Sequence, residues 1–253
     1  MIKKTLIIAG LLVSTSLIQH ASAAVIFSDD FRSYADDAAL TTVWARVSGT
    51  TNTIFLAPDP NVTRGQGIEQ TTLAGRLRHV VTATTPTAAV PLKYSFDFFD
   101  QGPPGTTNGG RVYAELRNSA GAAGLFAGGM YSSVNPGIYD PLKYQARNLD
   151  NGGWIQLNTS RTPGWHNFEF NIRATNVDLS IDGVVDPAFS NLSWGGGTAY
   201  DWMHLGSGLT GNSGANFDNV VLQTAPVPEP STIAFGLIGG AGLLFGFMRR
   251  RRS

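Results

Sequence analysis

The chain has 253 residues, with 18 basic and 18 acidic side chains and no cysteine. Cysteine-based metal sites and disulfides are therefore excluded, and a chain of this length can bury a sufficient core without such cross-links. Once two N-terminal lysines, four C-terminal arginines and Glu229 are set aside, residues 24–224 keep 12 basic and 17 acidic side chains, a net charge of about −5. That acidic excess argues against nucleic acid as a partner, because such binding depends on neutralising phosphates.

The N-terminus has the pattern of a secretory signal peptide. Two lysines precede an apolar run from Leu6 to Val13, and Ala21-Ser22-Ala23 supplies a small-x-small cleavage site. We therefore predict that residues 1–23 are removed on export and that the mature chain starts at Ala24.

The sequence of the body, residues 24–224, predicts an all-β fold. Short runs that alternate apolar and polar residues recur between clusters of Gly, Thr, Asn and Pro, a pattern typical of a β-sandwich. The runs with the clearest alternation are 92–98, 111–117, 165–173 and 177–182. Asp182-Gly183 predicts a tight hairpin, because glycine accepts the positive φ that such turns need. Only 35–44 suggests a short helix.

Four motifs of the body are together similar to a known fold family: Phe27-Ser28-Asp29-Asp30-Phe31, Gly164 to Phe170, the Ser180-Ile181-Asp182-Gly183 hairpin, and Ala215 to Val220. They resemble the concanavalin A-like lectin/glucanase jelly rolls, which include laminin-G-like domains. The resemblance implies an antiparallel jelly-roll β-sandwich in which the first and last strands lie side by side.

The residues expected of a glycosidase in this fold are missing. Glucanases of the superfamily carry Glu-x-Asp-x-x-Glu on one strand, whereas the body has only three glutamates, Glu69, Glu115 and Glu169, and none of them belongs to such a motif. Glycosidases need two carboxylates that flank the scissile bond. We therefore predict no catalytic residues and expect that the chain is not an enzyme.

An alternative stays open for the run 111–117. Arg111, Tyr113, Glu115 and Arg117 alternate onto one strand face, and lyases of the superfamily use Arg, Gln, His and Tyr clusters on their concave sheet. Asp97 could share a polar sheet face with Glu115. The alternative hypothesis is thus a polysaccharide hydrolase or lyase with a site at these residues, and an ordinary solvated strand face explains the same pattern.

The aromatic loops of the body suggest carbohydrate binding. A sugar-binding loop offers an exposed aromatic ring beside amides and carboxylates, and the sequence supplies such rings next to glycines and acidic residues. Large aromatics in a sandwich are also common in the core. The candidates for a glycan-binding surface are Trp154, Trp194, Tyr200, Asp201 and Trp202.

No cofactor is predicted, apart from a possible structural calcium ion. Calcium prefers oxygen ligands, and Asp29, Asp30 and Asp218 could meet if the first and last strands pair. Turn and strand-end carboxylates explain the same residues without a metal.

The C-terminal segment 225–253 has three parts in a fixed order. A Pro-Glu-Pro linker is followed by an apolar run, 232–248, and then by four arginines. Seventeen helical residues span about 25 Å, slightly less than a bilayer core of about 30 Å, so we predict a transmembrane helix. Arginines are retained on the cytoplasmic side, which places the body outside.

This order of elements resembles the PEP-CTERM sorting signal of Gram-negative bacteria. The residues that carry the resemblance are Val227, Pro228, Glu229, Pro230, Arg249, Arg250, Arg251 and Arg252. The resemblance implies recognition by an exosortase, a membrane protease-transpeptidase, followed by removal of the tail and release or attachment at the cell surface.

The sequence as a whole predicts a protein that passes the inner membrane, is anchored transiently by its C-terminal helix, and ends at the cell surface or outside the cell. We expect a non-catalytic carbohydrate-binding or structural sandwich of the envelope or extracellular matrix, associated with exopolysaccharide. Its expected partners are the exosortase, the membrane before processing, and exopolysaccharide.

Overall fold

The computed structural model describes residues 23–61, 63–102, 111–120, 125–131, 139–149, 153–209 and 214–225. Within the chain, Ser22–Val227 forms one compact unit. The predicted signal peptide up to residue 22, the Pro-Glu-Pro motif and the predicted transmembrane helix 232–248 lie outside the described residues. Among the residues described, no helix has the length and apolarity needed to cross a membrane.

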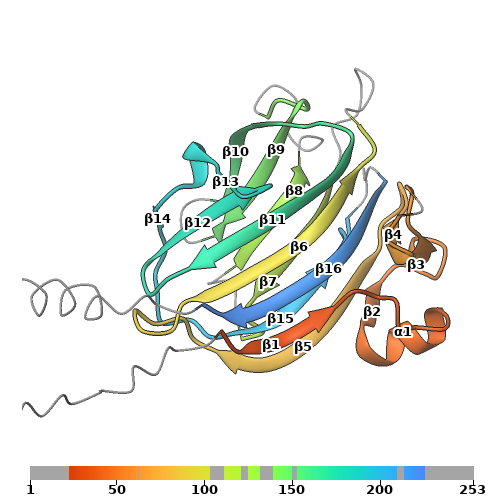
Figure 1. The fold of residues 1–253 in the computed structure, drawn as a ribbon, viewed down its shortest axis with the longest axis horizontal. Helices are drawn as coiled ribbons and strands as arrows, with labels where there is room; N and C mark the ends of the chain where they lie inside the picture. The colour runs from red at the N-terminus through yellow and green to blue at the C-terminus, as the bar shows by residue number, and fades with distance from the viewer. Residues whose placement is uncertain are drawn as a thin grey trace, which may run out of the picture. The chain divides into compact units, whose positions relative to one another are not determined.

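Two antiparallel sheets pack face to face to form a sandwich (Figure 1). Sheet A has the order β13-β12-β11-β6-β16-β4-β3, with β1 paired to β16 and β14 paired to β12. Its strands are β1 (Val25–Asp29), β3 (Ile54–Pro58), β4 (Gln66–Gln70), β6 (Leu92–Asp100), β11 (Gly164–Ile172), β12 (Asn176–Ile181), β13 (Val184–Val185), β14 (Leu192–Ser193) and β16 (Ala215–Thr224).

Sheet B has the order β10-β9-β8-β7-β15-β5-β2. Its strands are β2 (Ala45–Ser48), β5 (Arg76–Thr84), β7 (Arg111–Arg117), β8 (Leu125–Tyr131), β9 (Lys143–Asn148), β10 (Gly153–Ser160) and β15 (Tyr200–Leu205). The strands from β7 to β10 are consecutive in the sequence, whereas β15 and β5, which continue the sheet beyond β7, come from distant parts of the chain.

The all-β prediction is confirmed, and so is the pairing of the first strand with the last. Val25 lies opposite Gln223 and Asp29 opposite Val220 in the β1–β16 ladder. The alternating runs 92–98, 111–117, 165–173 and 177–182 correspond to β6, β7, β11 and β12. Period-two alternation identifies such strands because successive side chains point to opposite faces of a sheet.

The core between the sheets is rich in aromatic rings. Phe96 of β6 lies opposite Phe168 of β11, and their rings stack with centroids 5.3 Å apart. Tyr144 of sheet B meets the edge of Phe168 at 5.2 Å, which links the two layers. All three side chains are fully buried. Burial of such large apolar rings is the main term that holds the sheets together.

Two local predictions are also confirmed. The short helix is α1 (Asp37–Val43), which begins where the Asp36 carboxylate accepts a hydrogen bond from the backbone N–H of Ala39. The β12–β13 hairpin turns at Asp182 and Gly183, with φ of 53° and 79°. A single 3₁₀ turn, η2 (Pro187–Phe189), follows this hairpin.

One irregularity shapes the surface of sheet B. The register of β15 against β5 shifts between Tyr200 and Trp202, the sign of a β-bulge. Because a bulge inserts an extra residue, it changes which side chains face the core. Tyr200, Met203 and Leu205 are buried in the core, and Trp202 and His204 face the other way.

Candidate functional site

The face of sheet B that is turned away from the core carries a concentration of polar and aromatic side chains. These residues alternate along their strands with core residues such as Leu77, Ala114 and Met203. We call this surface the outer face of sheet B and define it by Arg76, Arg78, Arg111, Tyr113, Glu115, Arg117, Tyr131, Arg147, Trp154, Trp202 and His204. The predicted alternation of residues 111–117 onto one face is thus present in β7.

At the centre of this face, Glu115 contacts His204. The two residues lie opposite each other in the β7–β15 ladder, and Glu115 Oε1 is 2.5 Å from His204 Nδ1. Only 2% of Glu115 and 3% of His204 is exposed. Burying a carboxylate costs free energy unless the carboxylate is paired and hydrogen-bonded. The contact with His204 therefore offsets the cost of burying Glu115.

The surroundings of the pair set its protonation state. Burial raises the pKa of Glu115, but the hydrogen bond with His204 and the charges of Arg76 and Arg117 outweigh burial, so the pKa lies below its usual 4.5. Burial lowers the pKa of His204 below its usual 6.5, despite the contact with Glu115. At neutral pH the pair is therefore a carboxylate and a neutral imidazole. Since a carboxylate only accepts, Nδ1 carries the hydrogen and Nε2 keeps its lone pair.

Two arginines and a tyrosine complete the centre. The Nη1 atoms of Arg76 and Arg117 each lie 3.6 Å from Glu115 Oε1. Arg76 Nη2 donates to the Tyr113 hydroxyl at 3.1 Å. Burial and the charge of Glu115 raise the pKa of Tyr113, so the phenol keeps its proton at neutral pH. A pocket of about 440 Å³ opens over these residues, with Arg147 on its wall and Tyr113 and Glu115 among its lining side chains.

The charge of the outer face is opposite to that of the body. Five of the 12 basic residues of the body lie on this face, together with one glutamate. Arg78, Arg111 and Arg147 form no ion pair with any described residue. The buried Nε atoms of all five arginines lack a hydrogen-bond partner within the described part of the chain. Guanidinium groups present several donors that suit an anionic ligand such as a carboxylate.

The structure divides the predicted glycan-binding residues into two groups. Trp154 and Trp202 lie on the outer face of sheet B, where Trp202 packs under the guanidinium of Arg78 at 4.5 Å. The prediction is wrong for Trp194 and Tyr200, which are 3% and 0% exposed and pack against each other in the core. The bulge in β15 explains why Tyr200 points inward. Asp201 accepts hydrogen bonds from the backbone N–H and the hydroxyl of Ser119.

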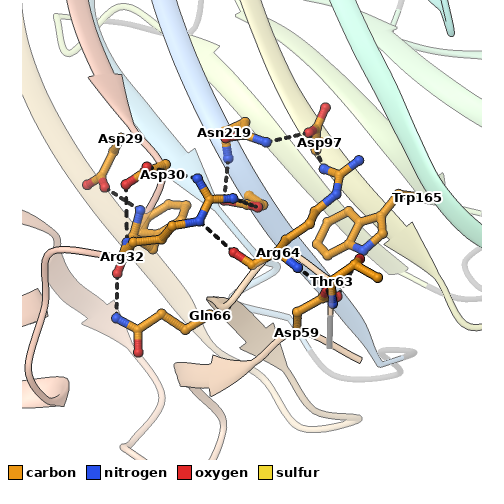
Figure 2. Close-up of polar contacts among 12 residues, drawn as sticks. Asp29, Asp30, Arg32, Asp59, Thr63, Arg64, Gln66, Asp97, Trp165 and Asn219 are labelled. Atoms are coloured by element: carbon orange, nitrogen blue, oxygen red, sulfur yellow. Dashed lines mark hydrogen bonds and ion pairs between the residues drawn. The ribbon is translucent and has the colours of Figure 1, made fainter. Parts of the chain in front are cut away.

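Asp97 does not share a face with Glu115, which corrects the proposed grouping with Arg111, Tyr113 and Glu115. Asp97 belongs to β6 of sheet A, and Figure 2 shows it in a separate polar network. Its carboxylate pairs with Arg64 and accepts hydrogen bonds from the side-chain amides of Asn167 and Asn219. With these partners Asp97 ties β6 to β11, β16 and the chain before β4.

The three aspartates suggested for calcium are engaged with protein donors. Asp29 Oδ2 accepts from the Tyr34 hydroxyl and from Trp44 Nε1, at 2.5 and 2.8 Å. Asp30 forms an ion pair with Arg32 (Figure 2). The guanidinium of Arg32 also lies 3.6 Å from the carboxylate of Asp218. Over the described ranges no three His, Cys, Asp or Glu side chains group so as to hold a metal ion. The structure thus does not assemble the suggested calcium site.

Several residues of the outer face were not found by sequence reasoning. Arg76 and Arg78 do alternate with Leu77, so the period-two pattern of β5 held a usable signal. His204 likewise lies between the core residues Met203 and Leu205, but nothing local in the sequence indicates its partner. Its pairing with Glu115 joins positions 89 residues apart, and only the sheet topology reveals it.

Comparison with protein families identifies the C-terminal tail. Residues 226–252 match the PEP-CTERM protein-sorting motif. The predicted resemblance of the tail is thereby confirmed, and the motif marks the chain for export and for membrane-associated sorting by an exosortase. No curated protein matches the chain by sequence.

Several solved structures with a similar fold have names of carbohydrate-active proteins. A carbohydrate esterase from the Shiga toxin-encoding bacteriophage phi24B is 14% identical, with a TM-score of 0.55 over 80% of this chain and 99% of that one. A glycosyl hydrolase family protein from Mycobacterium fortuitum is 13% identical, with a TM-score of 0.52 over 79% and 99%. A sialidase is 10% identical, with a TM-score of 0.52 over 82% of this chain and 19% of its own.

These likenesses correct the expectation that the chain is not an enzyme. At 10–14% identity they show the fold alone, and it is a fold in which a carbohydrate esterase and a glycosyl hydrolase family protein are found, whereas the sialidase matches over 19% of its own length. The absence of the Glu-x-Asp-x-x-Glu motif was not sufficient to exclude enzymatic activity. A site made of other residues, on the outer face of the same sandwich, was not excluded by that absence.

Proposed function

We propose that the chain is an exported, exosortase-sorted enzyme that cleaves an acidic polysaccharide by β-elimination on the outer face of sheet B. The observation that carries the proposal is the buried contact between Glu115 and His204, in which Glu115 lines an open pocket together with Tyr113 and Arg76. Sorting to the surface brings this site to the exopolysaccharide layer. The proposal thus adopts a lyase in place of a purely structural or binding role.

Elimination fits the site better than hydrolysis does. A glycosidase needs an acidic carboxyl group and a second carboxylate on the other side of the bond. Glu115 is the one carboxylate among the described residues that line the pocket, and its low pKa keeps it ionised. A lyase needs instead a neutral base, a proton donor and a cation that stabilises the carboxylate of a uronic acid.

The residues that line the pocket, together with His204, which contacts Glu115, can take these roles as follows. Arg76 and Arg117 bind the uronate carboxylate and stabilise the negative charge that develops beside it. Neutral His204, oriented by Glu115, accepts the proton on C5 at Nε2. The C4–O bond then breaks, a C4=C5 double bond forms, and Tyr113 gives its proton to the departing oxygen. No oxidant or reductant is required.

The reaction class can be tested with full-length protein in mild detergent. We would incubate it with polyuronates and with neutral glucans, and record both new reducing ends and the ultraviolet absorbance of the C4=C5 double bond. A lyase produces both signals from polyuronates, whereas a hydrolase produces reducing ends alone. We expect His204→Gln and Tyr113→Phe each to lower kcat by about 10²- to 10⁴-fold.

His166→Gln is the matched control, because His166 lies on sheet A and contacts Asp182. It should keep the wild-type rate. The proposal is wrong if no polysaccharide yields a double bond, if only reducing ends appear, or if His204→Gln and Tyr113→Phe cleave as fast as the control.

A further inference from the structure

A second cluster on the outer face of sheet B continues outward from the pocket centre. The register of the strands places side chains of β7, β8, β9 and β10 in one row, in which Glu115 lies opposite Ala127, Ala127 opposite Arg147, and Arg147 opposite Trp154. Strands lie about 4.8 Å apart, so the row extends about 14 Å from Glu115. Ala127, in the middle of the row, is buried among its neighbours.

Aromatic rings form the floor at the far end of this row. Trp154 and Tyr131 stack with ring centroids 4.0 Å apart and planes inclined by 8°. Tyr113, which belongs to the pocket centre, meets the edge of Trp154 at 5.0 Å. Trp154 and Tyr131 are only partly buried, so ring surface remains available to a ligand. Partly exposed aromatic rings of this kind can pack against the apolar faces of sugars.

Unpaired positive charge lies above the same rings. The Arg147 guanidinium is 6.0 Å from the centre of Trp154, and that of Arg111 is 5.3 Å from the centre of Tyr131. Neither arginine forms an ion pair with a described residue, and the buried Nε of each lacks an acceptor among them. An unpartnered buried donor carries a free-energy cost that an incoming anion would remove.

We propose that Arg147, Arg111, Trp154 and Tyr131 form a second subsite, which binds another anionic sugar of the same polymer. This inference rests on the proposed function, since it places the subsite beside the reacting sugar held by Arg76 and Arg117. The enzyme then recognises at least two acidic units at once and cleaves within a chain. Arg147 lies between the two positions, because it lines the pocket and also covers Trp154.

Calorimetric titration of the full-length protein with uronate monomers and oligomers of increasing length tests the subsite. The wild type should bind oligouronates more tightly than the monomer, and neutral oligosaccharides of equal length weakly. Arg111→Gln should weaken oligouronate binding about 10- to 100-fold and leave monomer binding unchanged, because Arg111 is not among the described residues that line the pocket and a hydrogen bond to a charged group is lost in the second position only.

Arg173→Gln is the matched control, since Arg173 pairs with Asp178 next to sheet A. Arg111→Lys keeps the charge and should recover part of the affinity, and thermal melting checks that each variant is folded. Affinity that does not depend on length, or an Arg111→Gln loss that is equal for monomer and oligomer, would overturn the subsite. Tighter oligomer binding without cleavage would refute the proposed function and leave the subsite intact. A sulfated neutral oligomer that binds as well would show recognition of charge rather than of the carboxylate.

Discussion

At the residue scale, the outer face of sheet B concentrates groups whose protonation is fixed by their neighbours. Glu115 keeps its charge because His204, Arg76 and Arg117 surround one of its oxygens. His204 stays neutral because burial opposes a second charge in the pair. An ionised carboxylate beside a neutral imidazole is the arrangement expected where the imidazole must accept a proton.

This arrangement makes the pH dependence of cleavage predictable. His204 must be neutral to accept a proton, so kcat/KM should fall on the acid side of a pKa below 6.5, the usual value for histidine. In Glu115→Gln the carboxylate no longer favours the imidazolium, so this acid limb should move to still lower pH. Profiles of kcat/KM against pH for the two proteins give the measurement. An acid limb above pH 6.5, or one that Glu115→Gln shifts upward, would contradict the assignment.

Asp218, which lies outside the proposed site, allows a separate prediction on stability. Burial raises its pKa from 3.8 to about 6, in spite of the backbone N–H of Asn219 and the charge of Arg32. The folded state therefore binds the extra proton more tightly, and stability falls as pH rises from about 4 to about 6. Asp218→Asn should be more stable than the wild type at pH 7, by up to about 3 kcal/mol, and equally stable near pH 4. Urea unfolding at both pH values measures this; an unchanged difference at the two pH values would show that Asp218 does not titrate in this range.

At the element scale, the irregular strands determine which side chains form the site. The bulge in β15 lets Tyr200 fill the core and still brings His204 beside Glu115. In β8, Gly129 has a φ of 147°, and its backbone runs close against β7. A side chain at this position would displace β7 at Tyr113, so glycine here preserves the distance between two strands of the site.

A comparison of two glycines tests that role. A Cβ on Gly129 would lie 2.5 Å from the carbonyl oxygen of Val112, whereas one on Gly183 would meet nothing within 4 Å, although its φ of 79° is also strained. Gly183→Ala should cost about 1–2 kcal/mol of unfolding free energy through backbone strain alone. Gly129→Ala should cost roughly 3–5 kcal/mol and also lower kcat, because β7 must move. Urea titration and measurements of kcat compare the two variants. Equal losses of unfolding free energy in both would mean that β7 accommodates the methyl group.

The same elements show how far the sequence alone could predict the fold and the site. Regular alternation identified β6, β7, β11 and β12, because a strand with one buried face has a fixed period of two. It also placed Arg111, Tyr113, Glu115 and Arg117 on one face. It could not identify all their partners, since β5 and β15 reach this face through long-range pairing that leaves no local pattern. Asp97 was assigned to the wrong sheet for the same reason, and Trp194 and Tyr200 to the surface instead of the core.

At the scale of the whole molecule, the sandwich and the sorting tail have separate tasks. The tail, with its PEP-CTERM motif at residues 226–252, carries the address. The sandwich closes on itself before the tail begins, because Ala24 and Thr224 exchange hydrogen bonds at 2.9 Å and the Ala225 N–H donates to the Pro91 carbonyl at 2.8 Å. Stability and activity should therefore belong to the body, and delivery to the tail.

A chain limited to residues 24–225 tests this division. It should melt within about 2 °C of the full-length protein and cleave at the same rate, because no described contact of the sandwich is removed. A chain of residues 30–225 is the matched comparison: it lacks β1, and with it the bonds from Asp29 to Tyr34 and Trp44, so its melting temperature should fall by roughly 10 °C or more. In cells, loss of residues 226–253 should leave the body folded but end its sorting to the surface, and fractionation with immunoblotting can follow this.

Two outcomes would contradict the division between body and tail. Normal surface delivery without the tail would show that the motif is not the sorting signal. A large drop in the melting temperature of residues 24–225 would show that the tail contributes to the stability of the fold.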